Sequence, residues 1–342
     1  MKLKTKSLII IIFLIILVII STASIFFGRY AIDFQSSISL FADIIRGVDI
    51  SQDDIKSNLH MIIFDIRMPR IFAAVLIGAA LSVSGAMMQS VFVNPLVSPG
   101  IMGVLSGASF GAAFGIVTFS SWVYVQFSSF IFGMISLFLA LLIARVYKST
   151  TALMLVLGGM ISGAFFSALL SIVKITADPY NELASIVFWL MGSLSMADSG
   201  AALIKAGIPL LIVTIGSCFL GRVLNILSMG DDEAKALGIN SNRYRVIILV
   251  VSAFLASMTV VIAGNIGWVG LIIPHIARMI IGPDNRFLLP LSAILGAIFL
   301  LICDNIVRNI SSAELPLGII TSIIGLIVFT IVLRNSQKGW HS

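Results

Sequence analysis

Long runs of apolar residues, separated by short segments that contain charges, prolines or glycines, follow one another from residue 8 to residue 334. Ten of these runs approach the length of about 20 residues that an α-helix needs to cross the hydrocarbon core of a bilayer. Backbone polar groups must be hydrogen-bonded internally within lipid, so runs of this length predict helices. The predicted spans are 8–27, 61–86, 97–117, 122–144, 152–174, 201–221, 245–264, 268–282, 287–306 and 315–334.

The composition is that of a protein lying mostly in lipid. Of the 342 residues, 59% are hydrophobic and only 11% are charged, whereas a soluble domain has about 25% charged residues. This composition excludes a soluble enzyme, a nucleic-acid-binding protein and a disordered chain. We therefore predict an all-α polytopic membrane protein with about ten transmembrane helices, folded as a single domain over residues 1–342.

The distribution of Lys and Arg predicts the orientation, because cytoplasmic loops are enriched in these residues. With the N-terminus inside, thirteen of the 21 basic residues fall on the cytoplasmic side, and eleven of the 15 acidic residues fall outside. Both termini are thus predicted to face the cytoplasm from the inner membrane. The lysines before residue 8 and the small residues 21–24 would also suit a cleaved signal peptide. Apolar residues 25–27 prolong the run and favour a retained span.

The source of energy is not visible in the chain. Ion-coupled transporters usually carry ionisable side chains deep in the membrane, but Asp65, Asp304 and Glu314 all fall near the ends of spans. The phosphate-binding pattern G-x-x-x-x-G-K-[ST] does not occur either. An active pump of this kind would need an ATPase on another subunit. We expect no catalytic residue, metal or cofactor on this chain, and a metal-ligand role for His275 is disfavoured because the few other donors are not convergent.

One substantial cytoplasmic loop, about 222–244, has the pattern of a short capped helix. A glycine can end the preceding helix, and acidic residues favour the positive end of a helix dipole. A small apolar face and a second glycine would complete a helix of about two turns. A helix this short is only marginally stable by itself, so we expect it to dock on a partner. A simple capped turn is the alternative interpretation. The residues concerned are Gly230, Asp231, Asp232, Glu233, Ala234, Leu237 and Gly238.

Several motifs, in order from residue 67 to the C-terminus, resemble the permease subunits of bacterial type II ABC importers. This is the FecCD-like family that includes iron-siderophore, haem and vitamin B12 permeases. One departure is Val97, where the family usually has Ala. The first sixty residues match only as a hydrophobic span. The blocks that carry the resemblance are Arg67–Arg70, Ser84–Gln89, Asn94–Gly103, Gly264–Arg278 and Glu314–Ile319.

The resemblance implies a ten-helix permease that pairs with a second copy, most simply as a homodimer. Two ATPase subunits, which hold ATP and Mg²⁺, would bind from the cytoplasm, and an extracytoplasmic binding protein would deliver the substrate. Residues Asp231–Gly238 would be the coupling helix that enters a cleft on the ATPase. The fifth and tenth predicted spans would line the transport route.

By the same resemblance, Arg67, Arg70 and Arg308 would meet acidic residues of the binding protein. Arginines at a membrane boundary also commonly snorkel toward water without a partner. Asn94, Leu96, Thr150 and Thr151 would form cytoplasmic gates, although Ser and Thr also begin helices and Asn-Pro also marks ordinary turns.

The resemblance predicts an ATP-driven importer whose cargo is an iron chelate, with a ferric siderophore as the leading hypothesis. Haem, cobalamin and molybdate or tungstate remain open. The alternatives from other classes are an ion-coupled secondary transporter and a passive channel.

Overall fold

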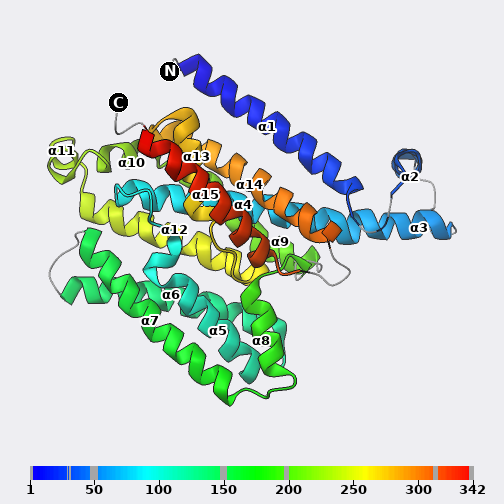
Figure 1. Cartoon of the computed structure of the whole chain (residues 1–342), viewed down its shortest axis with the longest axis horizontal. Helices are drawn as coiled ribbons and strands as arrows, with labels where there is room; N and C mark the ends of the chain where they lie inside the picture. The colour runs from blue at the N-terminus through cyan, green and yellow to red at the C-terminus, as the bar shows by residue number, and fades with distance from the viewer. Residues whose placement is uncertain are drawn as a thin grey trace.

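The computed structural model describes residues 3–28, 30, 32–46, 53–146, 152–195, 200–310 and 315–338. Within these ranges all regular structure is helical (Figure 1). The helices are α1 (Leu3–Phe26), α2 (Phe34–Arg46), α3 (Asp54–His60), the π-helix η1 (Met61–Arg67), α4 (Met68–Val91), the 3₁₀-helix η2 (Pro99–Met102), α5 (Val104–Thr118), α6 (Trp122–Val146), α7 (Ala152–Thr176), α8 (Glu182–Met191), α9 (Gly200–Cys218), α10 (Gly221–Leu227), α11 (Asp231–Ala236), α12 (Ser241–Ala263), α13 (Val269–Ile281), α14 (Asn285–Ile310) and α15 (Leu317–Lys338).

The all-helical, multi-pass fold class is confirmed. Among the described residues, six helices are long and apolar enough to cross a membrane, and the pair α9–α10, bent by 55°, supplies a seventh. The other predicted spans correspond to the shorter apolar helices α5, α13 and α15. Each of the ten predicted spans therefore contains a helix.

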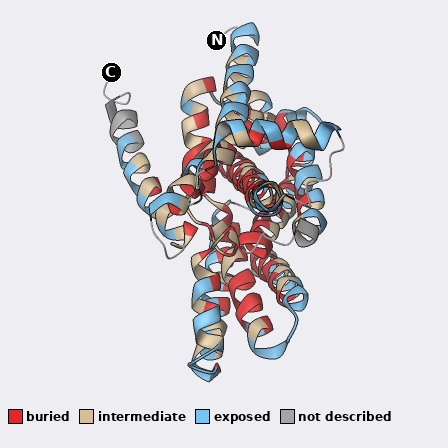
Figure 2. Ribbon diagram, turned by 90° about the vertical axis from the view of Figure 1, so that its right-hand side faces the viewer, coloured by how far each residue is buried: buried red, intermediate tan, exposed pale blue. Residues whose placement is uncertain are grey.

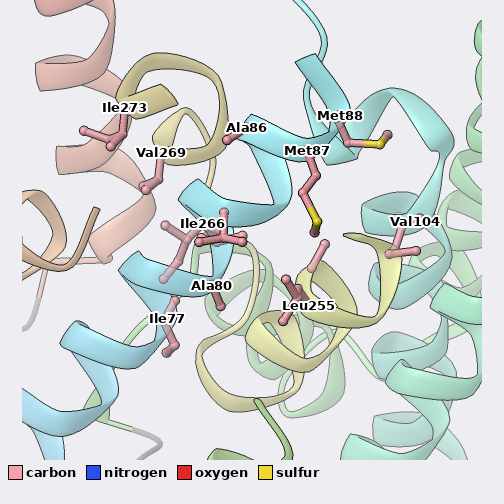
Figure 3. Packing of buried hydrophobic residues seen from close by; sticks show 14 of the residues in the cluster. Ile77, Ala80, Ala86, Met87, Met88, Val104, Leu255, Ile266, Val269 and Ile273 are labelled. Atoms are coloured by element: carbon pink, nitrogen blue, oxygen red, sulfur yellow. The ribbon is translucent and has the colours of Figure 1, made fainter. Parts of the chain in front are cut away.

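Helix α4 lies at the centre of the molecule and packs against α9, α12, α13 and α14. Figure 3 shows its side chains Ile77, Ala80 and Met87 among residues of α12 and α13. A helix that is apolar on every side belongs in the interior of a large protein or a bundle of spans, and α4 is buried at nearly every position from Ala73 to Val91.

Small residues let α4 approach its neighbours closely, as is usual between membrane helices. A Cβ added at Gly78 would lie 2.2 Å from the carbonyl oxygen of Gly296 on α14. A Cβ added at Gly85 would lie 1.8 Å from the carbonyl oxygen of Gly270 on α13. Helix α4 is therefore held in register with both neighbours along much of its length.

Four glycines spaced along the third predicted span, at positions 103, 107, 111 and 115, permit close packing of α5. A Cβ added at Gly107 or Gly111 would lie 2.4 Å or 2.5 Å from a carbonyl oxygen of α6. The predicted start of that span at residue 97 is wrong, because Pro99 begins a 3₁₀ turn and Gly103, with φ +74°, separates this turn from α5.

The second predicted span is longer than expected, because α3, η1 and α4 form one continuous helical rod from Asp54 to Val91. Pro69 lacks an N–H and cannot make the usual helical bond. Just before it, the Met68 N–H donates to the carbonyl of Ile63, five residues back, which is the π-helical pattern. The rod thus passes the proline without breaking.

The two ends of the molecule carry different elements. Figure 1 places α11 at one end of the long axis and α2 and α3 at the other, and we call these the α11 end and the α3 end. Helix α1 packs mainly along α14, and Figure 2 shows α1 and much of α15 exposed while the centre is buried. Exposed apolar surface on spanning helices is the surface that contacts lipid or another subunit.

Candidate functional site

At the α11 end, α11 is a six-residue helix between two glycines. Gly230, with φ +127°, precedes Asp231, Asp232 and Glu233 in the first turn, where acidic side chains favour the helix dipole. The helix ends at Ala236 rather than at Gly238, so it is shorter than the two turns expected from the sequence.

The chain leaves α11 through a hydrogen-bonded turn that explains this early end. Gly238 has φ +78°, its N–H donates to the carbonyl of Lys235, and the N–H of Ile239 donates to the carbonyl of Ala234. This pair of bonds is the Schellman motif, which requires a left-handed residue and so favours glycine. Asn240 then caps α12 by accepting from the N–H of Arg243 at 3.0 Å.

Two contacts fix α11 on the body of the protein. Ala234 is fully buried within the main apolar core. Nη2 of Arg245 on α12 donates to Oδ1 of Asp231 at 2.9 Å. The opposite side of this segment is open, with Leu237 59% exposed and the Asp232 carboxylate almost fully exposed. An exposed apolar side chain beside acidic groups is a surface that can bind a protein partner.

The loop between α13 and α14 lies at the same end and bonds to α10. Oδ1 of Asp284 accepts from Nδ2 of Asn225 on α10 at 2.7 Å, and Asp284 pairs with Arg286 at 2.7 Å. The Arg286 guanidinium, the largest influence, and the Asn225 amide hold the pKa of Asp284 well below its usual range. This carboxylate therefore joins α10 to the start of α14 and remains charged at neutral pH.

At the α3 end, the side chain of Asp304 on α14 is completely buried between two arginines. Arg70 on α4 donates from Nε to Asp304 Oδ1 at 2.8 Å. Arg308, one turn along α14, places its Nε 3.0 Å from Asp304 Oδ2. Buried charges persist only when paired, so this cluster joins α4 to α14.

Arg67 is also buried, and its partners are backbone carbonyls. Its guanidinium donates to Ile25, at the end of α1, and to Tyr30 at 2.6 Å. Beside it, Asn305 donates to Oγ of Ser24 at 2.7 Å. A cavity of about 210 Å³ is lined by Arg67, Arg70 and Arg308. The three arginines that the sequence analysis assigned to binding-protein docking thus surround one cavity, and each is bonded within the chain.

Sequence reasoning missed the role of Asp304, which it noted only as a carboxylate near the end of a span. The signal was present, because Asp304 and Arg308 are four residues apart and share one face of a helix. The pairing with Arg70 joins residues 234 positions apart in the sequence, and no local pattern predicts it.

Of the predicted gate residues, Asn94 and Leu96 lie in the exposed turn that follows α4. Oδ1 of Asn94 accepts from the N–H of Leu96 at 2.9 Å, and the preceding Val93 has an unusual φ of +48°. Thr150 and Thr151 lie outside the described residues.

The known proteins that this chain resembles agree with the family suggested by its motifs. The model of the FecCD transport family matches residues 13–335. The chain belongs to the FecCD transport family. A metal-chelate type ABC transporter, solved in an inward-facing conformation, superposes with a TM-score of 0.85 and 37% identity over 96% of this chain and 99% of that one.

The curated relatives of this chain differ in the cargo that their names state. The molybdate import system permease protein MolB of Haemophilus influenzae is 39% identical over 82% of this chain and 83% of its own length. A probable iron chelatin permease of Helicobacter pylori is 39% identical over 82% and 85%. The cobalamin import permease BtuC of Halobacterium salinarum is 35% identical over 84% and 77%.

Family membership determines the class of function. The protein is the multi-pass membrane permease of an ABC importer, a class whose permease subunits are generally non-catalytic and work with an ATPase and a substrate-binding protein. The ion-coupled secondary transporter and the passive channel are therefore not supported. The relatives span molybdate, iron chelates and cobalamin, so family membership does not select the cargo.

Proposed function

We propose that this permease moves an iron chelate, with a ferric siderophore as the leading cargo, into the cytoplasm as part of an ATP-driven importer. The observation that carries the coupling mechanism is the segment Asp231–Gly238, anchored by Ala234 and open on its other side. In this proposal the segment is the coupling helix, the α11 end faces the cytoplasm, and both termini lie on that side.

The coupling segment can transmit force because it is anchored at both of its ends. Asp231 pairs with Arg245 on α12, and the turn through Gly238 leads directly into the cap of that same helix. A displacement of α11 by an ATPase would therefore be passed to α12. Binding energy at α11 would select between two arrangements of the pathway.

The second copy and the gates belong to the same proposal. Helices α7 and α15 expose large apolar side chains, among them Phe165 and Ile323, and we propose that these helices face a second identical permease across the route. Asn94 and Leu96, exposed after α4, would form its inner gate together with Thr150 and Thr151.

The arginine cluster is proposed as the docking region for the binding protein. All three guanidinium groups line the cavity, and only Arg70 and Arg308 pair with a carboxylate, that of Asp304, so the cavity at the α3 end is positively charged. Acidic groups of a partner would be attracted there, and such charge complementarity chiefly speeds and orients docking. Arg67→Glu with Arg70→Glu tests this, and Arg67→Lys with Arg70→Lys separates the loss of charge from the loss of the internal bonds.

The test of the docking region is stimulation of ATP hydrolysis by the binding protein in an assembled importer. Reversal should abolish stimulation while the ATPase subunits remain attached, and the lysine pair should retain part of it. Full stimulation of the reversed variant would rule out the docking role.

Molybdate is the second candidate cargo, because MolB and the iron chelatin permease are both 39% identical to this chain. The likeness to a metal-chelate transporter favours the chelate. Uptake of labelled ferric siderophore, haem, cobalamin and molybdate should be compared in a strain that lacks the chain. We expect selective loss of ferric siderophore uptake, restored by the intact chain but not by one lacking residues 231–238. Selective loss of molybdate uptake would contradict the chelate assignment.

A further inference from the structure

A second cavity, of about 420 Å³, lies at the α11 end between α6, α7 and α12. Part of its wall is apolar and includes Phe138 and Leu142 of α6 and Val246 of α12. The rest includes two basic side chains, Arg145 and Arg245. No carboxylate is among the described residues that line this cavity. The site is therefore amphipathic and positively charged.

The apolar part of this cavity continues into a stripe along α6. The stripe residues are spaced by three or four positions, so they share one face of the helix. All of them are exposed large apolar side chains, which on a spanning helix are a suitable surface for acyl chains. They are Phe127, Ile131, Ile135, Phe138 and Leu142.

The two arginines differ in their environment. Arg145 is in the last turn of α6 and is exposed. Arg245 is only 9% exposed and pairs with Asp231, which lies outside the cavity lining. A guanidinium group has five N–H donors in a planar fork, so Arg245 can donate to Asp231 on one side and to an anionic oxygen on another.

We propose that this cavity binds one anionic phospholipid of the inner leaflet, with its phosphate at Arg145 and Arg245 and one acyl chain along the α6 stripe. The proposal rests on the proposed function, which places the α11 end in the cytoplasm. The cytoplasmic leaflet is rich in anionic lipid, and basic pockets between spanning helices bind such headgroups.

The bound lipid has a direct route to the coupling segment. Arg245 joins the cavity to Asp231, the first residue of α11. A phosphate held by Arg245 fixes this guanidinium in place and so restrains the start of α11. Lipid composition would in this way affect the element that receives force from the ATPase.

The binding test uses the purified full-length permease and native mass spectrometry, with phosphatidylglycerol and phosphatidylcholine of the same acyl chains as probes. The permease should retain more phosphatidylglycerol than phosphatidylcholine. Arg145→Gln should lower its affinity about fivefold, since one basic residue near the surface contributes about 1 kcal/mol. Arg222→Gln is the matched control, because Arg222 is exposed on α10 at the same end.

A second pair of variants tests the acyl groove without changing charge. Leu142→Trp adds bulk inside the cavity, and Phe127→Trp adds bulk to the same stripe outside it. Only Leu142→Trp should weaken phosphatidylglycerol binding. Excess inorganic phosphate should not displace the lipid, and displacement by phosphate would show a simple anion site instead.

Equal retention of the two lipids, or equal losses in Arg145→Gln and Arg222→Gln, would overturn the proposal. If the permease binds the ATPase normally but shows no preference for phosphatidylglycerol, the lipid site alone is contradicted. Preferred phosphatidylglycerol with no ATPase binding would instead contradict the proposed function. If the assembled ATPase displaces the lipid, the cavity is an ATPase contact rather than a lipid site.

Discussion

The two ends of this permease hold their charged residues in opposite ways. At the α3 end, Asp304, Arg70 and Arg67 are buried and bonded within the chain. In α11, at the other end, Asp232 is almost fully exposed, whereas Asp231 pairs with Arg245 of α12. The same family resemblance assigned the arginines of the one end and the α11 residues of the other to contacts with partner proteins.

The difference shows that docking would involve an exposed segment at the α11 end and a buried, internally bonded cluster at the α3 end. The α11 segment presents its surface without prior rearrangement, so its variants should affect partner binding and leave the fold intact. The arginine cluster also joins α1, α4 and α14. Its variants should therefore lower stability as well as docking, and four experiments test this contrast.

Removal of Asp304 should have the largest effect. Asp304→Ala leaves two buried arginines without their shared carboxylate, and loss of one partner of a buried ion pair costs about 3–5 kcal/mol. We expect a much lower unfolding temperature in detergent. Asp65→Ala is the control, because Asp65 is an exposed aspartate on the same rod. Equal unfolding temperatures for the two variants would show that the cluster does not stabilise the fold.

The packing of α4, which connects the two ends, is the next test. Gly85→Ala would place a methyl group against the Gly270 carbonyl, and overpacking of this kind costs about 1–3 kcal/mol. Gly216→Ala in α9 meets nothing within 4 Å and should leave stability unchanged or raise it slightly. Thermal unfolding of both variants measures the difference. A neutral Gly85→Ala would mean that α4 and α13 are not tightly packed.

Leu237→Asp should weaken ATPase binding without unfolding the permease. The substitution places a charge at the exposed apolar position beside α11. Burying this unpaired carboxylate in an interface would cost more than about 1 kcal/mol, so we expect a loss of roughly tenfold in affinity. Ile55→Asp makes the same change on exposed α3 at the opposite end. If both variants bound the ATPase equally well, Leu237 would not be part of the interface.

Acid should have the smallest effect, through Asp284. The folded-state pKa of this carboxyl lies below its usual value, so its contribution to stability is present above the ordinary pKa of about 3.9 and is lost as the pH falls below it. Asp284→Asn should therefore unfold at a slightly lower temperature than the wild type at neutral pH. The gap should close in acid, and a gap that widened there would contradict the sign of this effect.

The sequence predicted much of the fold and the location of the α11 segment. Long apolar runs determine spanning helices directly, and glycines flanking acidic residues determine a short capped helix such as Asp231–Ala236. Starts of helices were predicted less well, because the π-helical continuation before Pro69 and the left-handed Gly103 depend on local backbone geometry.

The internal bonds of the arginine cluster could not be predicted. Arg67 and Arg70 stand in a motif that suggests surface charge, yet their partners at Ile25, Tyr30 and Asp304 come from distant parts of the chain. Such pairings depend on how the helices pack. The cargo could not be predicted either, because relatives with similar sequences carry molybdate, iron chelates or cobalamin by their names.

The most direct test of the account is co-purification of the ATPase subunits with the tagged permease. The intact chain should retain them. A chain in which residues 231–238 are replaced by a Gly-Ser segment of equal length should lose them while it still elutes as a folded protein in size-exclusion chromatography. ATPase bound to this variant at the level of the intact chain would contradict the assignment of Asp231–Gly238 as the coupling segment.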